Sequence, residues 1–220
     1  MRREQLLQRT QWPDPYVDFV PLAEPSQLSW HFDHDFLTQV VYRRCPRPSL
    51  VLEVGSWLGK SAIYSTRHYV NTLQWTDFTL ICVDTWLGSI EHWLRPPDSE
   101  IRQALNLRHG YPQLYHHFLS NVMHMGAHPY IQPLPQTSSN AARILRYYGL
   151  GFDWIFLDAS HETLDVFLDL DLYWPLVKPG GVMCGDDWNW PGVRKAVEDF
   201  TAERNLRVYN SENSWAFFKM

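Results

Sequence analysis

The residues best suited to chemistry stand at the ends of short apolar runs. The first run leads into two glycines four residues apart, Gly55 and Gly59. The second run ends at Asp84, the third at Asp158 and the fourth at Asp186. Continuous apolar runs of this length are typical of parallel strands that are buried on both faces. Ligands bind at the carboxyl ends of such strands, so we expect these side chains to surround a binding site.

The glycine segment indicates a cationic ligand. It reads EVGSWLGKS over residues 53–61, which matches neither the nicotinamide pattern G-x-G-x-x-G nor a phosphate loop. Gly55 allows a tight turn, and Gly59 lets a ligand approach the start of the next helix. Glu53, two positions before Gly55, would repel a pyrophosphate and suits a positively charged group. The alternative is a plain turn between a strand and a helix.

Asp84 is the candidate for binding a ribose. An acidic residue at the end of the second strand accepts hydrogen bonds from both ribose hydroxyls in nucleoside-binding sheets. Asp77 is the competing acid, but it precedes the strand and would lie at the wrong edge of the sheet.

Alternating strands and helices predict an α/β fold: a Rossmann-like, doubly wound, mostly parallel sheet with one antiparallel strand near its edge. A Lys-Pro-Gly-Gly run should end one of the helices. The expected strands are 49–56, 79–85, 130–134, 153–158, 182–185, 206–209 and 215–219, and the expected helices are 35–43, 59–71, 114–125, 140–148, 163–177 and 191–205.

The predicted organisation is an N-terminal arm and helix over residues 1–48, a possible cap, followed by one domain over 49–220. An insertion of about residues 87–113 interrupts that domain. It contains Glu91-His92-Trp93, which either shapes an acceptor pocket or forms an exposed loop. A cluster at His31-Phe32-Asp33-His34-Asp35 lacks a third partner at a defined spacing, so we expect a solvated helix start there.

Composition narrows the class of protein. The chain has 220 residues, 45% of them hydrophobic, and a net charge of −5, which gives no footprint for nucleic acid. No apolar run is long enough to cross a membrane. The three cysteines are far apart, so we expect neither a disulfide framework nor zinc, and we expect a cytoplasmic protein. The oligomeric state stays open, with a homo-oligomer possible.

The order of these motifs resembles a known family. E-x-G-x-x-x-G at Glu53, then Asp84, then F-L-D ending at Asp158 and L-V-K-P-G-G-V before residue 183 are similar to class I methyltransferases that use S-adenosylmethionine (SAM). Asp158-Ala159-Ser160-His161 and Gly185-Asp186-Asp187-Trp188 resemble the metal-dependent O-methyltransferases, including the macrocin-type sugar enzymes.

The resemblance implies a role for each cofactor-binding residue. Gly55, Ser56 and Gly59 would line the methionine part of SAM, and Glu53 would hold its ammonium group through water. Asp84 would bind the ribose. The adenine would lie beside two residues that follow the expected strand at 130–134, Thr137 and Ser138.

In this family the strands that end at Asp158 and at Asp186-Asp187 are neighbours, so three carboxylates would converge. Uncompensated, they would raise one another's pKa, and a hard divalent cation such as Mg²⁺ would resolve the repulsion. Asp158 is therefore assigned to the cofactor, the metal and catalysis together. The alternative is that Asp186 caps a turn, Asp187 is solvated and only Asp158 faces the ligand.

The implied reaction is Mg²⁺-dependent transfer of a methyl group from SAM to a hydroxyl of a small molecule such as a sugar or polyphenol. His161 would take the proton, unless it caps a helix or only supports a ligand-binding residue. Asp187 or a metal-bound water could replace it. Two rival hypotheses are a SAM-binding protein without turnover and an oxidoreductase on the same fold.

Overall fold

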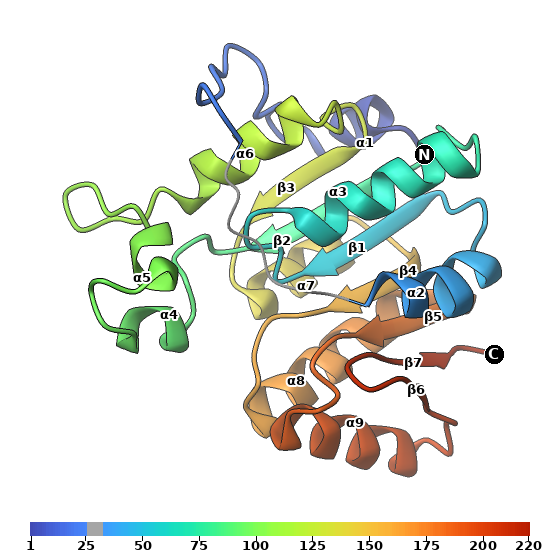
Figure 1. Ribbon diagram of the computed structural model, residues 1–220. Coiled ribbons are helices and arrows are strands. Elements are labelled where there is room, and N and C mark those ends of the chain that lie inside the picture. The colour runs from blue at the N-terminus through green and yellow to red at the C-terminus, as the bar shows by residue number, and fades with distance from the viewer. Residues whose placement is uncertain (26–32) are drawn as a thin grey trace.

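The computed structural model describes residues 1–25 and 33–220, and the described residues form a seven-stranded sheet (Figure 1). The strand order is β3-β2-β1-β4-β5-β7-β6, and every pairing is parallel except those of β7 with β5 and β6. This confirms the predicted doubly wound sheet with one reversed strand near its edge. The strands are β1 Leu50–Val54, β2 Thr79–Asp84, β3 Ile131–Pro135, β4 Phe152–Leu157, β5 Val177–Gly185, β6 Tyr209–Asn210 and β7 Trp215–Phe218.

Helices cover both faces of the sheet, because side chains alternate between two separate apolar cores. On β1, Val51 belongs to one core, and Leu50 and Leu52 belong to the other. The first face carries α2 His34–Phe36, η1 Leu37–Tyr42, α3 Lys60–Arg67, η2 His68–Thr72 and α6 Leu114–His124. The second carries α1 Arg3–Thr10, α7 Ser138–Tyr147, α8 Thr163–Tyr173, η3 Trp174–Leu176 and α9 Pro191–Glu203.

The N-terminal segment is more regular than predicted. Residues 3–10 form α1, which the polar sequence did not indicate because Leu6 is its only apolar side chain in the core. The predicted helix at 35–43 is present as α2 followed by the π-helical η1. Asp33 caps α2 by accepting a hydrogen bond from the backbone N–H of Phe36 (2.9 Å), whereas His31 and Phe32 lie outside the described residues.

The predicted boundary between the helix at 163–177 and the next strand was wrong. The α-helix α8 ends at Tyr173, and β5 already begins at Val177, so the Lys-Pro-Gly-Gly run lies inside β5. A bulge accommodates the run, because the partner of Phe152 is Val177 but the partner of Trp154 is Val182. The Lys-Pro-Gly-Gly run does interrupt regular structure, but it forms a bulge within β5 and not a loop between a helix and a strand.

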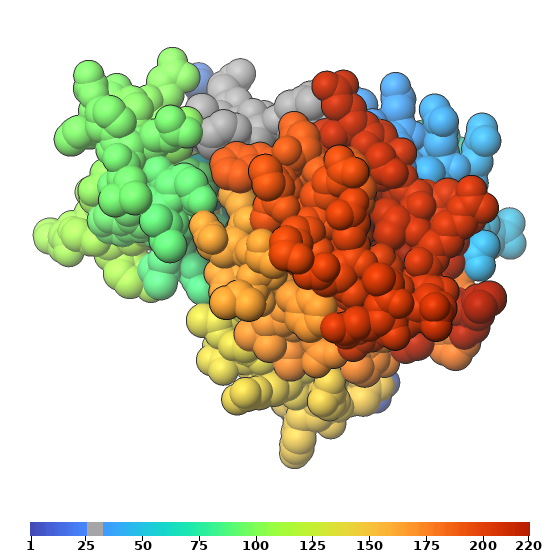
Figure 2. Space-filling view, turned by 90° about the horizontal axis from the view of Figure 1, so that it is seen from below, coloured from blue at the N-terminus to red at the C-terminus, as the bar shows by residue number. Residues whose placement is uncertain are grey.

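The insertion at 87–113 forms a lobe beyond the carboxyl ends of the strands. It contains two short helices, α4 Ile90–Leu94 and α5 Glu100–Ala104, and neither has a buried residue. In Figure 1 both helices lie to the left of the sheet, outside its two layers of helices. In Figure 2 this green lobe stands beside the orange surface formed by residues around 160–190.

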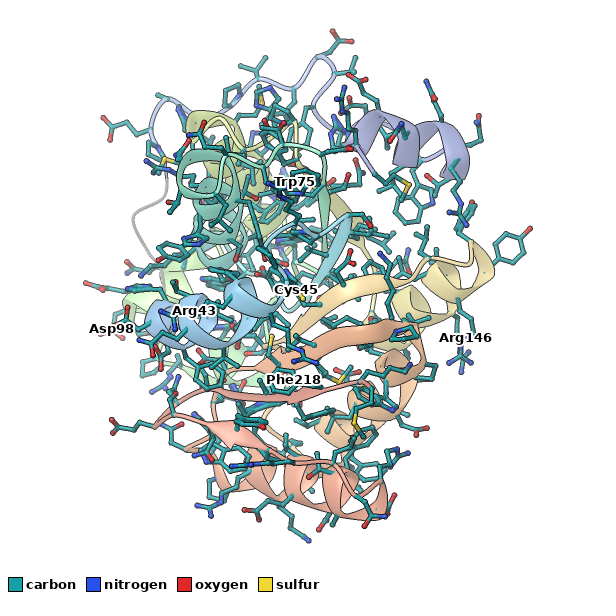
Figure 3. The ribbon with its side chains drawn as sticks, turned by 90° about the vertical axis from the view of Figure 1, so that its right-hand side faces the viewer. Arg43, Cys45, Trp75, Asp98, Arg146 and Phe218 are labelled. Carbon is teal, nitrogen blue, oxygen red and sulfur yellow. The ribbon has the colours of Figure 1, made fainter. Side chains whose placement is uncertain are left out.

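The three cysteines, Cys45, Cys82 and Cys184, are buried and free. Figure 3 shows Cys45 toward the middle of the molecule, whereas the exposed residues Asp98 and Arg146 lie toward its left and right edges. Within the described residues, no helix combines the length and the apolar character that crossing a membrane requires. The cytoplasmic location stays a prediction.

Candidate active site

A cavity of about 530 Å³ opens at the carboxyl ends of the parallel strands, under the insertion. Its walls come from the segments after β1, β2, β3, β4 and β5 together with α4. The predicted site residues that line it are Gly55, Asp84, Ser138, Asp158, His161, Asp186 and Asp187. Such a position is where ligands bind in open α/β sheets. None of the described residues before Val54 lines this cavity.

Gly55 is required by a close approach between two strand ends. Its φ is +88°, and its N–H donates to the carbonyl of Val83 (2.8 Å). A Cβ at this position would lie 1.8 Å from the carbonyl oxygen of Asp158. The loop after β1 is therefore in close contact with the end of β4, and only glycine fits at position 55.

Asp84 holds the loop after β1 in place. Its Oδ2 accepts from the backbone N–H of Trp57 (2.8 Å), and its Oδ1 accepts from that of Trp86 (2.7 Å). Burial raises the pKa of Asp84, and these backbone donors oppose the shift. Each carboxylate oxygen keeps a lone pair for a further donor, so the half-buried Asp84 can serve the loop and a ligand together.

Glu53 lies beneath the glycine loop and does not line the cavity. Its side chain is only 1% exposed, and neither carboxylate oxygen has a hydrogen-bond partner with acceptable geometry. Burial raises the pKa of Glu53 to about 7, although the hydroxyls of Ser61 and Ser56 favour the charged form. An unpaired buried carboxylate destabilises the fold, so a hydrogen-bond donor or a cation bound beside Glu53 would stabilise it. Its predicted role toward the ammonium group stays a prediction.

Three other predicted cofactor residues also stay outside the cavity wall. Ser56 is 2% exposed, so its hydroxyl lies inside the fold beside Glu53 and not at the cavity. A Cβ on Gly59 would meet the ring of Phe118 at 3.0 Å, so this glycine is needed for packing against α6. Thr137 caps α7 by accepting from the N–H of Asn140 (3.3 Å).

The predicted acidic residues meet at the ends of β4 and β5. Asp186 accepts through Oδ1 from Asn213 (2.7 Å) and Ser214 (3.0 Å). Burial, followed by the charge of Asp187, raises the pKa of Asp186 to about 7. Burial and the charges of Asp186 and Asp187 also raise the pKa of Asp158 well above its usual range. Ionising all three carboxyls together is therefore unfavourable unless a cation lies beside them.

Across the described ranges, no set of three or more acidic, histidine or cysteine side chains is arranged to enclose a metal ion. The donor chemistry nevertheless fits a hard cation, because carboxylate oxygens are the ligands that Mg²⁺ prefers. Asp187 adopts a left-handed backbone conformation (φ +60°), which turns it away from the path of β5.

His161 stands between two carboxylates. Its Nε2 lies 2.9 Å from Oδ2 of Asp187, and its Nδ1 lies 3.5 Å from Oε1 of Glu91 in α4. The hydrogen bond to Asp187 is the main cause that raises the pKa of His161. The ring stacks on Trp190 with 4.2 Å between ring centroids. The imidazole is thus fixed in orientation at the cavity wall.

The insertion contacts both sides of the cavity. Besides the ion pair of Glu91 with His161, the ring of His92 stacks on Trp57 at 4.1 Å between centroids. The lining residues Arg95, Gln136 and Trp190 were not predicted. Gln136 directly precedes the predicted Thr137 and Ser138, so its position after β3 could have indicated that it lines the cavity. No feature of the sequence indicated this for Arg95 or Trp190.

Comparison with known proteins identifies the family of the chain. Residues 52–188, more than half of the chain, match a family model described as a methyltransferase domain. The chain belongs to this family and is a SAM-dependent methyltransferase of class I. A search of the curated proteins finds no match.

Solved structures share the fold at low sequence identity. An O-methyltransferase from Bacillus cereus in complex with SAH, the product that remains after SAM has lost its methyl group, is 16% identical with a TM-score of 0.57, covering 98% of this chain and 90% of that one. A putative O-methyltransferase from Klebsiella pneumoniae is 17% identical with a TM-score of 0.57, covering 99% and 96%. The calicheamicin methyltransferase CalS11 is 16% identical with a TM-score of 0.56, covering 84% and 78%.

Proposed function

We propose that this methyltransferase transfers the methyl group of SAM to a hydroxyl oxygen of a small molecule such as a sugar or polyphenol. The observation that carries the proposal is the hydrogen-bonded pair of His161 and Asp187 in the wall of the cavity that Gly55 and Asp84 also line. Such a pair is suited to removing a proton from an alcohol. The structural neighbours described above as O-methyltransferases support the same class of acceptor.

The fixed geometry of His161 indicates which atom takes the proton. When Nε2–H donates to Asp187, the lone pair of the neutral ring is on Nδ1, which lies 3.5 Å from Oε1 of Glu91 and forms an ion pair with it only once Nδ1 is protonated. Nδ1 therefore takes the acceptor's proton, and the resulting imidazolium is stabilised by Asp187 on one side and Glu91 on the other. SAM supplies an electrophilic methyl group on a sulfonium, whose positive charge suits the acidic wall. Asp84 binds the ribose, and Ser138 faces the adenine.

The reaction is proposed to depend on Mg²⁺, held by Asp158, Asp186 and Asp187. Such a cation would lower the pKa of a coordinated hydroxyl and would compensate the three carboxylates. An acceptor with two neighbouring hydroxyls would suit this site best, because both oxygens can bind one cation.

The test is transfer of a labelled methyl group from SAM to a panel of diols and matched single alcohols, before and after chelation. Transfer to oxygen that stops with the chelator and returns with Mg²⁺ is expected. Full activity after exhaustive chelation would refute the metal role and leave oxygen transfer intact. SAM binding without transfer to any acceptor of the panel would instead support the non-catalytic hypothesis.

Calorimetry with nicotinamide dinucleotide separates the remaining rival. SAM and SAH are expected to bind, and the dinucleotide is not, because Glu53 lies under the glycine loop and would repel a pyrophosphate. Tighter binding of the dinucleotide than of SAM would favour the oxidoreductase hypothesis.

A further inference from the structure

A buried carboxylate fixes the hydroxyl of Ser138 at the wall of the cavity. Ser138 is the first residue of α7, and its Oγ donates a hydrogen bond to Oδ1 of Asp169 on the neighbouring α8. Asp169 is only 8% exposed. The hydroxyl of Tyr173, one turn further along α8, donates to the backbone carbonyl of Ser138 (2.7 Å). Two contacts from α8 thus hold both the main chain and the side chain of Ser138.

The direction of this hydrogen bond decides what Ser138 can offer to a ligand. A serine hydroxyl has one proton to donate and two lone pairs that accept. An ionised carboxylate can only accept, so the proton of Ser138 is committed to Asp169. Burial raises the pKa of Asp169 to about 6, which leaves it ionised at pH 8. Toward the cavity, the Ser138 hydroxyl is therefore an acceptor and not a donor.

The position of Ser138, shortly after the edge strand β3, places it beside the proposed position of the cofactor's base. The reacting methyl group must lie near His161 and Asp158, after β4, and the ribose is proposed to lie at Asp84, after β2. Because β3 lies beyond β2 in the sheet order, the base is directed toward the segment after β3. That segment lines the cavity through Gln136 and Ser138.

We infer that Asp169 is a positioning residue that makes Ser138 select a 6-aminopurine over a 6-oxopurine. On the edge of adenine, only the exocyclic amino group donates a hydrogen bond, and it matches the acceptor that Ser138 presents. A 6-oxo group would place an acceptor against an acceptor. A binding site that leaves polar groups unpaired in this way rejects the wrong ligand. The inference rests on the proposed cofactor position, but it needs neither the acceptor nor the metal.

The test compares the Kd of SAH with that of its 6-oxo analogue, S-inosylhomocysteine, by calorimetry at pH 8. The wild type should bind SAH at least about tenfold more tightly. In Ser138→Ala and Asp169→Asn the preference should fall below about threefold, because the asparagine side chain can donate to Ser138 and release its proton. Ser138→Thr, which keeps a hydroxyl, should retain the preference.

Tyr173→Phe is the matched control, because it removes a hydrogen bond to Ser138 without touching the side-chain pair, and it should keep the wild-type ratio. Equal affinities in the wild type would overturn the inference, as would an unchanged ratio in either Ser138→Ala or Asp169→Asn. If Asp169→Asn does not fold, Asp169→Ala takes its place, and an unchanged ratio in that variant overturns the inference. Failure of the wild type to bind SAH would overturn the cofactor position itself, whereas failure of oxygen transfer would leave this result standing.

Discussion

His161 and Asp187 form a hydrogen-bonded pair, with 2.9 Å between Nε2 and Oδ2, although they follow different strands and are 26 positions apart. The pair exists because β4 and β5 are neighbours and because the left-handed conformation of Asp187 returns its side chain toward β4. Gly192 completes the arrangement, since a Cβ there would lie 2.2 Å from the carbonyl oxygen of His161. The start of α9 can therefore approach His161 closely enough for Trp190 to stack on the ring.

Replacing His161 by alanine should lower kcat by about 10²–10⁴-fold, the usual contribution of a positioned general base. The Kd of SAM should barely change, because the ring contacts Asp187, Glu91 and Trp190. The measurement is steady-state turnover together with calorimetry. His109→Ala, at an exposed position of the insertion, serves as the control. Wild-type turnover in His161→Ala would show that the ring is structural.

Replacing Asp84 by alanine should weaken SAM binding by roughly 2–4 kcal/mol, because charge-assisted hydrogen bonds to the ribose are lost. The loop at Trp57 and Trp86 also loses its two acceptors, so the melting temperature should fall as well. Asp77→Ala, at the opposite end of the same strand, should leave SAM affinity unchanged. An Asp84→Ala protein that binds SAM normally would rule out the ribose role.

Asp186→Asn and Asp187→Asn should each reduce Mg²⁺-dependent turnover. The affinity for SAM should stay close to that of the wild type in both variants. In Asp186→Asn, the new amide keeps an oxygen that accepts from Asn213 and Ser214, so the fold should be retained. The readouts are the Mg²⁺ concentration at half-maximal activity and the Kd of SAM. Asp98→Asn removes an exposed charge of the insertion and should change neither. An unchanged Mg²⁺ requirement in both site variants would contradict the proposed ligand set.

Replacing Glu53 by glutamine should stabilise the free protein at alkaline pH. Because the pKa of Glu53 is about 7 in the folded protein and ordinarily 4.5, the native state keeps this proton up to a higher pH than the unfolded state does. The stability of the wild type therefore falls between about pH 4.5 and pH 7, by roughly 3 kcal/mol, and is level above this range. The advantage of Glu53→Gln in melting temperature should thus be larger at pH 8 than at pH 5.

The same Glu53→Gln protein should bind SAM more weakly if Glu53 serves the ammonium group. Higher stability and weaker binding together would show a carboxylate that is retained for its ligand. An equal difference in melting temperature at pH 5 and pH 8 would contradict the buried ionisation of Glu53.

Strong apolar runs made most of the sheet predictable. β1, β2 and β4 are continuous hydrophobic segments, and glycine or acidic residues mark their ends, so their positions followed from local sequence. α1, α4 and α5 were missed because they bury few or no side chains and therefore have no apolar period. The start of β5 was missed because a bulge uses the same residues as a turn.

The site was predictable as a set of strand ends but not as a set of contacts. Asp158, Asp186 and His161 follow strands, so their common edge could be inferred from the fold. The bond from Ser138 to Asp169 joins two helices, and the ion pair of Glu91 with His161 crosses from the insertion. Pairings of this kind depend on tertiary packing, for which a single sequence carries no local signal.

The unburied helices of the insertion have a consequence for how this enzyme can change over time. Residues of α4 contribute to the cavity wall, yet none of them supports either apolar core. Substitutions there can reshape the pocket at little cost in folding free energy, whereas changes at the strand ends disturb tightly packed backbone. Under the proposed function, acceptor range can therefore diversify through α4 and α5, and a library aimed at new acceptors is best confined to residues 90–104 other than Glu91 and His92, which contact His161 and Trp57.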